Sequence, residues 1–371
     1  MSVFDYSGQW TGLSDGNPQG KIVLELDSDS KGSKGFAYLF SPDVGVPSSL
    51  VELAINTNKK KFTINSAPQP FDARIGYRLN ENELSRHFPN VTFPSSVSID
   101  FERVSENKIN VTWRSNIETF GRGELERSTV TKLSKLDGEF DVRSWNDFKT
   151  AVSKMAFQRF IFRGQSAAFP LRTTFHRSKR KVLHYYLNND IPTLHRSITG
   201  RTKHIFNLDR PSDLGALMNL AQHHGFPTPL LDWTYSPFVA AWFAYQNVGS
   251  GRKMEDTVRI YALDRQEINK FPQFTNLTHT EPHTSILEAL PIDNERAIPQ
   301  QGLLMLSNVH DIESHIFELE YTSGRQLLTA YDLPVDDAHD ALNDLAMMGI
   351  TRSTMMPGIE SICLDLKERL F

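Results

Sequence analysis

The sequence predicts an α+β protein in which an antiparallel β region precedes a mixed α+β region. Up to residue 132, apolar and polar residues alternate in several short segments, which is typical of strands with one buried face. From residue 133 onward, some segments carry apolar residues at helical spacing and others form short apolar runs. This change of pattern predicts two domains, residues 1–132 and 133–371.

In the first region, polar clusters rich in Gly, Pro, Asp and Ser separate the alternating segments, so short strands joined by turns are expected. The clearest strands are 21–27, 35–40, 96–102 and 107–114. Such a series predicts a β-barrel or a β-sandwich. The opening SGQWTG resembles the first strand of calycin-like barrels. We expect this region to sense or dock a protein partner, with a ligand-holding barrel as the alternative.

In the second region, helix signals are strongest where a capping residue precedes an apolar stripe. Ser144 precedes Trp145, Phe148 and Val152, and Ser236-Pro237 opens another apolar helix. Further helices are expected at 179–190, 214–224, 336–348 and after Pro357. Strands are expected at 158–162, 227–234, 258–264 and 316–322, and again after the QQG run that ends at Gly302. Their irregular alternation with helices predicts a mixed sheet.

Composition limits the classes of function. The chain has 371 residues, a net charge of −4 and one cysteine, Cys363. This charge argues against bulk binding of nucleic acid, and a lone cysteine excludes an internal disulfide framework. The N-terminus has no signal-peptide pattern, and no apolar run is long enough to span a membrane. We therefore expect a soluble cytoplasmic protein without a membrane partner.

The first candidate site segment places a cation at the end of an apolar run. Arg163 directly precedes Gly164 and Gln165, and Arg172 follows a short turn. A guanidinium offers a planar fork of donors that suits phosphate, and glycine lets a ligand approach the main chain. The alternative is an arginine in a salt bridge at a sheet edge. We predict a pocket that binds phosphate or carboxylate.

The second segment is AQHHGFPTPLLDWT, residues 221–234. His223 and His224 end a predicted helix, where a plain C-terminal role is the commoner one. Asp232 and Trp233 lie in an otherwise apolar strand. A buried carboxylate needs a partner, so we expect Asp232 to pair with Arg163 or a histidine and to organise the site.

Two further segments supply polar groups. Thr234 and Ser236 stand at a helix start, where hydroxyls and free amides can bind an anion or a ribose, although capping alone requires only Ser236. Arg296 and the run Gln300-Gln301-Gly302 precede an apolar strand. These amides can equally bind only main chain. No metal site is predicted.

Together these residues resemble the FRG domain family, named for a Phe-Arg-Gly motif that matches Phe162, Arg163 and Gly164. Its long signature, QHHGxPTxLLDWTxSPxxAxxFA, matches residues 222–244, and later pieces match 296–303 and 348–359. Pro229 stands where the family usually has an arginine. The resemblance implies that the cationic contact is either missing or supplied by Arg172 or Arg296.

The motif order is similar to that of ADP-ribosyltransferases, which implies an NAD-dependent transferase or NAD-cleaving enzyme, in the setting of a toxin or of phage defence. NAD is then a substrate. The implied catalytic residues are His224, Asp232 and Gln301, where Gln301 or Gln300 replaces the usual glutamate. The implied binding residues are Arg163, Gly164, Gln165, Arg172, His223, Trp233, Thr234, Ser236 and Arg296.

Two other functions stay open. A nuclease or other phosphodiester-cleaving enzyme would use His223, His224 and Asp232 as acid–base groups. A non-catalytic module would bind a nucleotide-like small molecule, and the N-terminal region would bind a protein or phage component. The missing glutamate favours the second of these alternatives.

Overall fold

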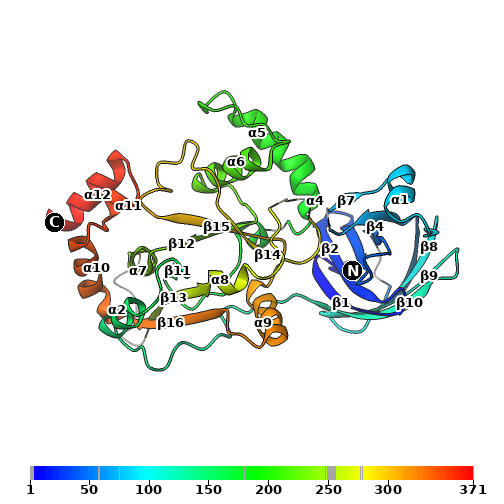
Figure 1. Ribbon diagram of the computed structural model, residues 1–371, viewed down its shortest axis with the longest axis horizontal. Helices are drawn as coiled ribbons and strands as arrows, with labels where there is room; N and C mark the ends of the chain where they lie inside the picture. The colour runs from blue at the N-terminus through cyan, green and yellow to red at the C-terminus, as the bar shows by residue number, and fades with distance from the viewer. Residues whose placement is uncertain are drawn as a thin grey trace.

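The computed structural model describes residues 4–56, 59–74, 76–178, 180–246, 248, 256–275, 277 and 279–370. Two β-sheets lie next to each other along the long axis of the molecule (Figure 1). The first sheet is formed by the N-terminal part of the chain, and helices surround the second. In the described residues, no helix is both long and apolar enough to cross a membrane.

The first sheet has ten strands, and every neighbouring pair is antiparallel. In sheet order, the strands are β5 (Lys61–Ser66), β8 (Val97–Arg103), β9 (Lys108–Ser115), β10 (Phe120–Arg127), β1 (Gly8–Asn17), β2 (Gly20–Asp29), β3 (Gly32–Phe40), β4 (Ser48–Ile55), β6 (Gln69–Asp72) and β7 (Tyr77–Arg78). A short helix, α1 (Glu81–His87), connects β7 to β8.

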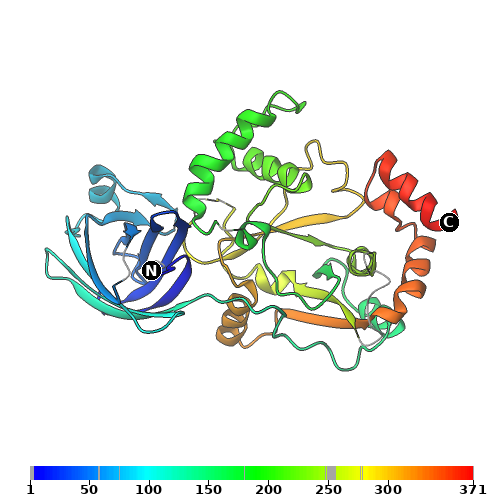
Figure 2. The same cartoon turned by 180° about the vertical axis from the view of Figure 1, so that it is seen from behind.

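The prediction of a closed barrel or a two-sheet sandwich is wrong, because the strands form one open sheet. Strand β6 pairs with β4 and occupies the edge that β5 would need for closure. The sheet is nevertheless strongly curved (Figure 2). Residues from distant strands, among them Leu24, Val51, Ile99 and Val111, therefore share one apolar core. Trp10 is buried there, and its Nε1 donates to the Tyr6 carbonyl at 2.8 Å.

The second sheet has six strands, in the order β14 (Thr284–Leu287), β15 (Gly302–Ser307), β12 (Leu230–Thr234), β11 (Phe160–Gln165), β13 (Thr257–Asp264) and β16 (Leu328–Pro334). All of the neighbouring pairs are antiparallel, so the prediction of a mixed sheet is wrong. Strands β12 and β13 do run parallel, as a strand–helix–strand pattern suggests. Strand β11 lies between them and separates the parallel pair.

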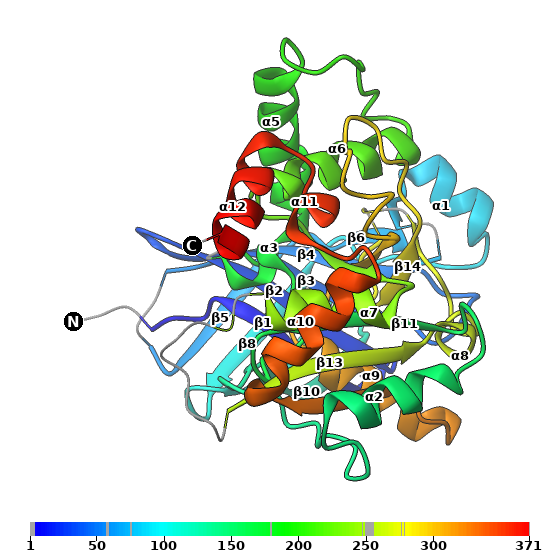
Figure 3. The same cartoon turned by 90° about the vertical axis from the view of Figure 1, so that its left-hand side faces the viewer.

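Helices cover this sheet, and α10, α11 and α12 lie nearest the viewer in Figure 3. The helices are α2 (Trp145–Ser153), α3 (Thr174–Arg177), α4 (Leu183–Tyr185), α5 (Ile191–Ile198), α6 (Pro211–His223), α7 (Pro237–Tyr245), α8 (Arg265–Ile268), α9 (Ile312–Ser323), α10 (Ala338–Met347), α11 (Arg352–Met355) and α12 (Ile359–Leu370). The capping hydroxyls of Ser144 and Ser236 accept hydrogen bonds from main-chain amides, which confirms both predicted helix starts.

Two expected elements differ from the prediction. Residues 316–322, expected as a strand, belong to helix α9, since Asp311 caps its start and Gly324 ends it with a φ of +65°. Buried Ile312 and Ile316 are one helical turn apart, a spacing that the strand interpretation overlooked. The helix expected at 179–190 is replaced by α4 and a π-helical turn, Tyr186–Asp190. Lys179 lies outside the described residues.

Helix α7 packs directly against strand β11, and a glycine makes this contact possible. A Cβ placed on Gly164 would lie 1.8 Å from the Ala240 carbonyl oxygen and 2.9 Å from the Ala244 amide nitrogen. Both alanines are fully buried. Gly164 therefore has a packing role between strand and helix, whatever it contributes to a ligand site.

We expect Gly164→Ala to lower the free energy of unfolding by about 3 kcal/mol or more, because neither main-chain atom can move without separating helix and strand. Urea unfolding of both proteins measures the difference. Gly200→Ala is the matched control, since none of the described residues places an atom within 4 Å of its added Cβ. Equal midpoints for all three proteins would contradict this packing role.

A polar network joins the two sheets. The Gln9 amide donates to the Asn308 carbonyl at 2.9 Å and accepts from the His310 amide at 3.0 Å. Asp27 accepts from the main-chain amides of Lys181 and Val182. Because these contacts satisfy polar groups that are buried, they fix how the sheets meet.

The carboxyl group of Glu25 belongs to this network and is protonated, and therefore uncharged, below its raised pKa. It is 5% exposed, it accepts from Gln9 at 3.2 Å, and burial raises its pKa to about 8. A folded pKa above the unfolded value means that stability is complete at low pH and is lost between pH 4.5 and pH 8. At pH 7, the raised pKa of Glu25 lowers the free energy of unfolding by about 3 kcal/mol.

Glu25→Gln keeps the shape and the acceptor but does not titrate. We therefore expect the variant to match the wild type near pH 4 and to be more stable by about 3 kcal/mol at pH 7. Urea unfolding across pH 4–8 measures the divergence. Parallel curves for the two proteins would show that Glu25 is not the titrating group.

Candidate functional site

A cavity of about 330 Å³ opens where β11 and β12 separate. In the described chain these strands are paired at one Cα position, Phe162 opposite Thr234, and they diverge beyond it. The apolar lining includes Phe162, Trp233, Ala240, Phe243, Leu303, Leu304 and Met356. The polar lining comprises Arg163, Asn219, Gln222, His223, Asp232, Thr234, Asn294, Arg296 and Gln300. This mixture suits a ligand that has both a ring and polar or charged groups.

Arg163 bridges the two separating strands. Its Nη1 donates to the main-chain carbonyl of Asp232 at 2.7 Å, while its buried Nε has no hydrogen-bond partner in the described part of the chain. Burial lowers the pKa of Arg163, an effect opposed by Asp232 and reinforced by Arg177. Since β11 is an inner strand, Arg163 is not the edge-strand arginine of the alternative interpretation. A half-buried cation with free donor capacity favours an anionic ligand.

The carboxylate of Asp232 lines the cavity and is exposed to the solvent inside it. Its Oδ1 accepts from the Gln222 amide, whose own oxygen accepts from the Thr228 hydroxyl. This chain of contacts fixes both the orientation of the amide and the rotamer of the acid. Desolvation by the surrounding protein raises the pKa of Asp232, although the Arg163 charge and the Gln222 hydrogen bond oppose the shift.

The loop before β15 closes one side of the cavity. The Thr234 hydroxyl donates to the Gln300 carbonyl at 2.7 Å, and the Gln300 side chain donates to the Met355 carbonyl at 2.8 Å. Thr234 Oγ1 also accepts from the Ser236 amide at 3.0 Å. The Gln300 amide and the Thr234 hydroxyl proton are therefore occupied in the fold, which limits what they can offer a ligand.

Three more predicted residues line the cavity. His223 projects from the last turn of α6, and burial lowers its pKa with help from Arg296 and His224. Arg296 lines the cavity from the loop before β15, and its buried Nε has no hydrogen-bond partner among the described residues. Trp233 is buried and its Nε1 also lacks an acceptor. Together with Arg163, these residues provide hydrogen-bond donors that lack acceptors around the cavity.

Five predicted residues lie outside the cavity lining. Gln165 donates to the Phe169 carbonyl at 2.8 Å, Arg172 contacts His310 and the His176 carbonyl, and Ser236 caps α7. His224 is exposed beyond the end of α6. Gln301 is exposed in a left-handed turn with a φ of +47°. Of the three residues predicted to be catalytic, the structure thus brings Asp232 to the cavity and leaves His224 and Gln301 outside it.

Sequence reasoning missed Asn219 and Gln222, two of the three polar residues that α6 contributes. Asn219, Gln222 and His223 are spaced by three and four positions, so they share one helical face. The helical periodicity of this segment was sufficient to find them once His223 was a candidate. No sequence pattern distinguished Asn294 from the other loop residues.

The family model of the FRG domain matches residues 158–253, a range that contains β11, α6, β12 and α7. The chain therefore contains an FRG domain. No curated protein matches this chain, and no solved structure does.

Asp232→Asn tests the environment of the acid. Because the folded pKa is raised, wild-type stability falls as pH increases from about 4, the unfolded value, through the folded pKa. Asparagine retains an acceptor for Gln222 and does not titrate. We expect the variant to gain stability relative to the wild type as pH rises, with no difference below pH 4, as measured by urea unfolding. Asp15→Asn, at an exposed surface pair, is the control.

Proposed function

We propose that the cavity binds the phosphate and ribose portion of a nucleotide and that NAD is its substrate. The observation that carries this proposal is the half-buried side chain of Arg163, which lines the cavity and whose buried Nε has no hydrogen-bond partner among the described residues. Arg296 supplies a second cation, which suits a diphosphate. Phe243 and Trp233 supply ring-sized apolar walls. A volume of about 330 Å³ accommodates part of a dinucleotide and leaves the rest in solvent.

The reaction we propose is cleavage of the bond between nicotinamide and ribose. When the bond breaks, its electron pair leaves with nicotinamide, and positive charge develops on the ribose ring. Among the described cavity residues, Asp232 is the carboxylate that can stabilise this charge. Water or an acceptor hydroxyl then attacks the ribose carbon, and its proton passes to Asp232 or His223. The products with water are ADP-ribose, nicotinamide and a proton.

This assignment replaces the expected glutamate with an aspartate on a different strand. Gln300 faces the cavity but carries no charge, and its amide already donates to Met355. Asp232 has both a fixed rotamer and a raised pKa, which suits a group that stabilises charge and then accepts a proton. The role expected for Gln301 stays a prediction without support from its exposed position.

A second candidate is cleavage of a phosphodiester. His223 lines the same cavity as Asp232, and its lowered pKa favours the neutral form that acts as a base. Arg163 would then bind the scissile phosphate. Hydrolysis of RNA or DNA without added NAD, lost in His223→Ala, would favour this function over the first. Ligand binding without any turnover would favour a non-catalytic module.

Arg163→Ala tests the anchor. We expect NAD binding to weaken by about 2–5 kcal/mol, roughly 30-fold to several thousand-fold in Kd, because the substitution leaves a phosphate unpaired in a partly desolvated site. Calorimetric titration measures Kd, and release of nicotinamide measures turnover. Arg122→Ala, at an exposed pair on the first sheet, is the control. Unchanged binding by folded Arg163→Ala would remove Arg163 from the proposal.

A further inference from the structure

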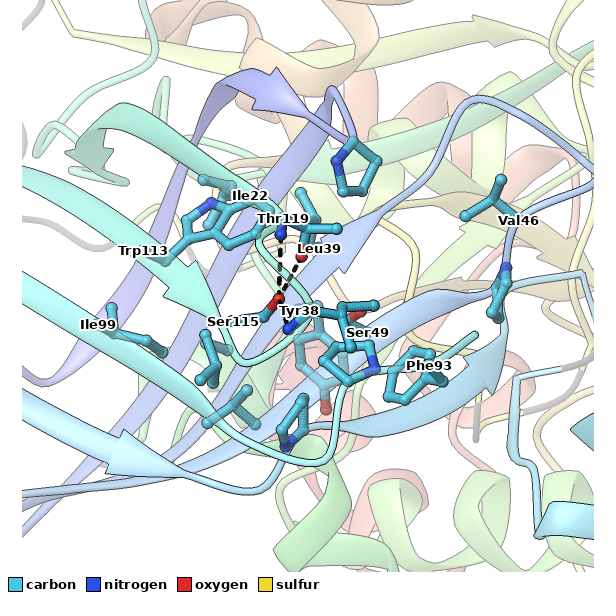
Figure 4. Close-up of a pocket in the computed structure, with 18 of the residues that line it drawn as sticks. Ile22, Tyr38, Leu39, Val46, Ser49, Phe93, Ile99, Trp113, Ser115 and Thr119 are labelled. Carbon is cyan, nitrogen blue, oxygen red and sulfur yellow. Dashed lines mark hydrogen bonds between the residues drawn. The ribbon is translucent and has the colours of Figure 1, made fainter. Parts of the chain in front are cut away.

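The curved face of the first sheet encloses a second cavity, of about 150 Å³, far from Arg163 in the chain. Figure 4 shows its walls, which come from inner positions of β2, β3, β8 and β9. Its lining is almost entirely apolar and includes Ile22, Leu39, Val51, Ile99 and Phe101. No Asp, Glu, Lys, Arg or His is among the described residues that line it. A charged ligand would find no compensation there.

One wall of this cavity carries a hydrogen-bond donor that has no acceptor among the described residues. Trp113 lines the cavity, and its Nε1 is buried without a hydrogen-bond acceptor. Trp10 in the same core donates from its Nε1 to Tyr6, so the sheet does satisfy an indole where it is structural. An unsatisfied buried donor costs about 1–3 kcal/mol, and native structures contain few of them. The described part of the chain therefore leaves Trp113 Nε1 without an acceptor.

A second polar atom, for which no partner is found among the described residues, lies near the ring of Trp113. Ser14, 5% exposed on β1, has a buried hydroxyl without a partner. A Cβ on Gly121 would lie 2.8 Å from both the Ser14 hydroxyl and the ring of Trp113, so the two side chains meet across this glycine. The Ser115 hydroxyl, in contrast, already contacts Thr119, as the dashed lines in Figure 4 show.

Part of the cavity wall is formed by connecting segments instead of paired strands. Val46 and Pro47, in the connection from β3 to β4, and Phe93 and Pro94, in the connection from α1 to β8, line it. These connections can move apart without breaking strand-to-strand hydrogen bonds, so they offer a path for a small molecule.

From these features we propose that the first sheet binds one small, uncharged, mainly apolar molecule that carries a hydrogen-bond acceptor. The apolar walls surround its hydrocarbon part, and the acceptor receives the indole proton of Trp113. The volume matches a single aromatic ring with a short substituent, since an apolar protein cavity of about 150 Å³ accommodates benzene. This site is separate from the cavity of the proposed enzyme function and does not depend on it.

Acetophenone and ethylbenzene form a matched pair of probes, because they have similar size and differ in one carbonyl acceptor. We expect wild-type protein to bind acetophenone about five-fold more tightly, which corresponds to one net hydrogen bond. The indole N–H resonance of Trp113 should shift with acetophenone and much less with ethylbenzene. Calorimetric titration and NMR of the full chain provide the two measurements.

Trp113→Phe keeps a ring and removes the donor. We expect it to bind both probes equally, with acetophenone weakened about five-fold and ethylbenzene unchanged. Ala37→Phe places a ring into the cavity and should abolish binding of both. Arg163→Ala, in the other cavity, should leave both affinities unchanged. If neither probe binds wild-type protein up to its solubility limit, or if both bind Trp113→Phe as they bind the wild type, the proposal is overturned.

Discussion

The candidate site depends on one hydrogen bond, from the Arg163 guanidinium to the main-chain carbonyl of Asp232. Strands β11 and β12 are paired at a single position and then separate, which leaves a main-chain acceptor of β12 without its ladder partner. A long side chain from β11 reaches that acceptor in place of a main-chain amide. The gap between the strands is thereby stabilised as a cavity, and the cation that bridges it is also the group that can bind an anion.

Much of the second region was predictable because its signals are local. A serine cap followed by an apolar stripe fixed the start of α2, and Ser236-Pro237 fixed that of α7. The strand order was not predictable, since the insertion of β11 between β12 and β13 depends on pairing between distant segments. Curvature without closure in the first sheet is equally non-local, because it depends on which strand pairs with β4.

The site itself was predictable in part. Arg163 and Asp232 were recognisable because a charge in an apolar strand requires a partner. The expected pairing of the Asp232 carboxylate with Arg163 or a histidine is wrong, because the carboxylate accepts from Gln222 and Arg163 donates to the main-chain carbonyl. The positions of His224 and Gln301 were not, because each follows from the geometry of a chain turn. His224 lies beyond the last turn of α6, and Gln301 adopts a left-handed conformation that turns its side chain away. A difference of one residue, from Gln301 to Gln300 or from His224 to His223, decides which side chain reaches the cavity.

Strand β2 is buried on both faces, which is unusual for a strand of an antiparallel sheet with short turns. Ile22, Leu24 and Leu26 point into the curved core, whereas Glu25 and Asp27 point toward the second sheet. Inserting or deleting one residue within this strand would exchange the two sets, placing carboxylates in hydrocarbon and leucines at the polar junction. Variation in length during evolution should therefore be confined to the hairpins at its ends, and the spacing between Ile22 and Asp27 should be invariant among relatives that retain both sheets.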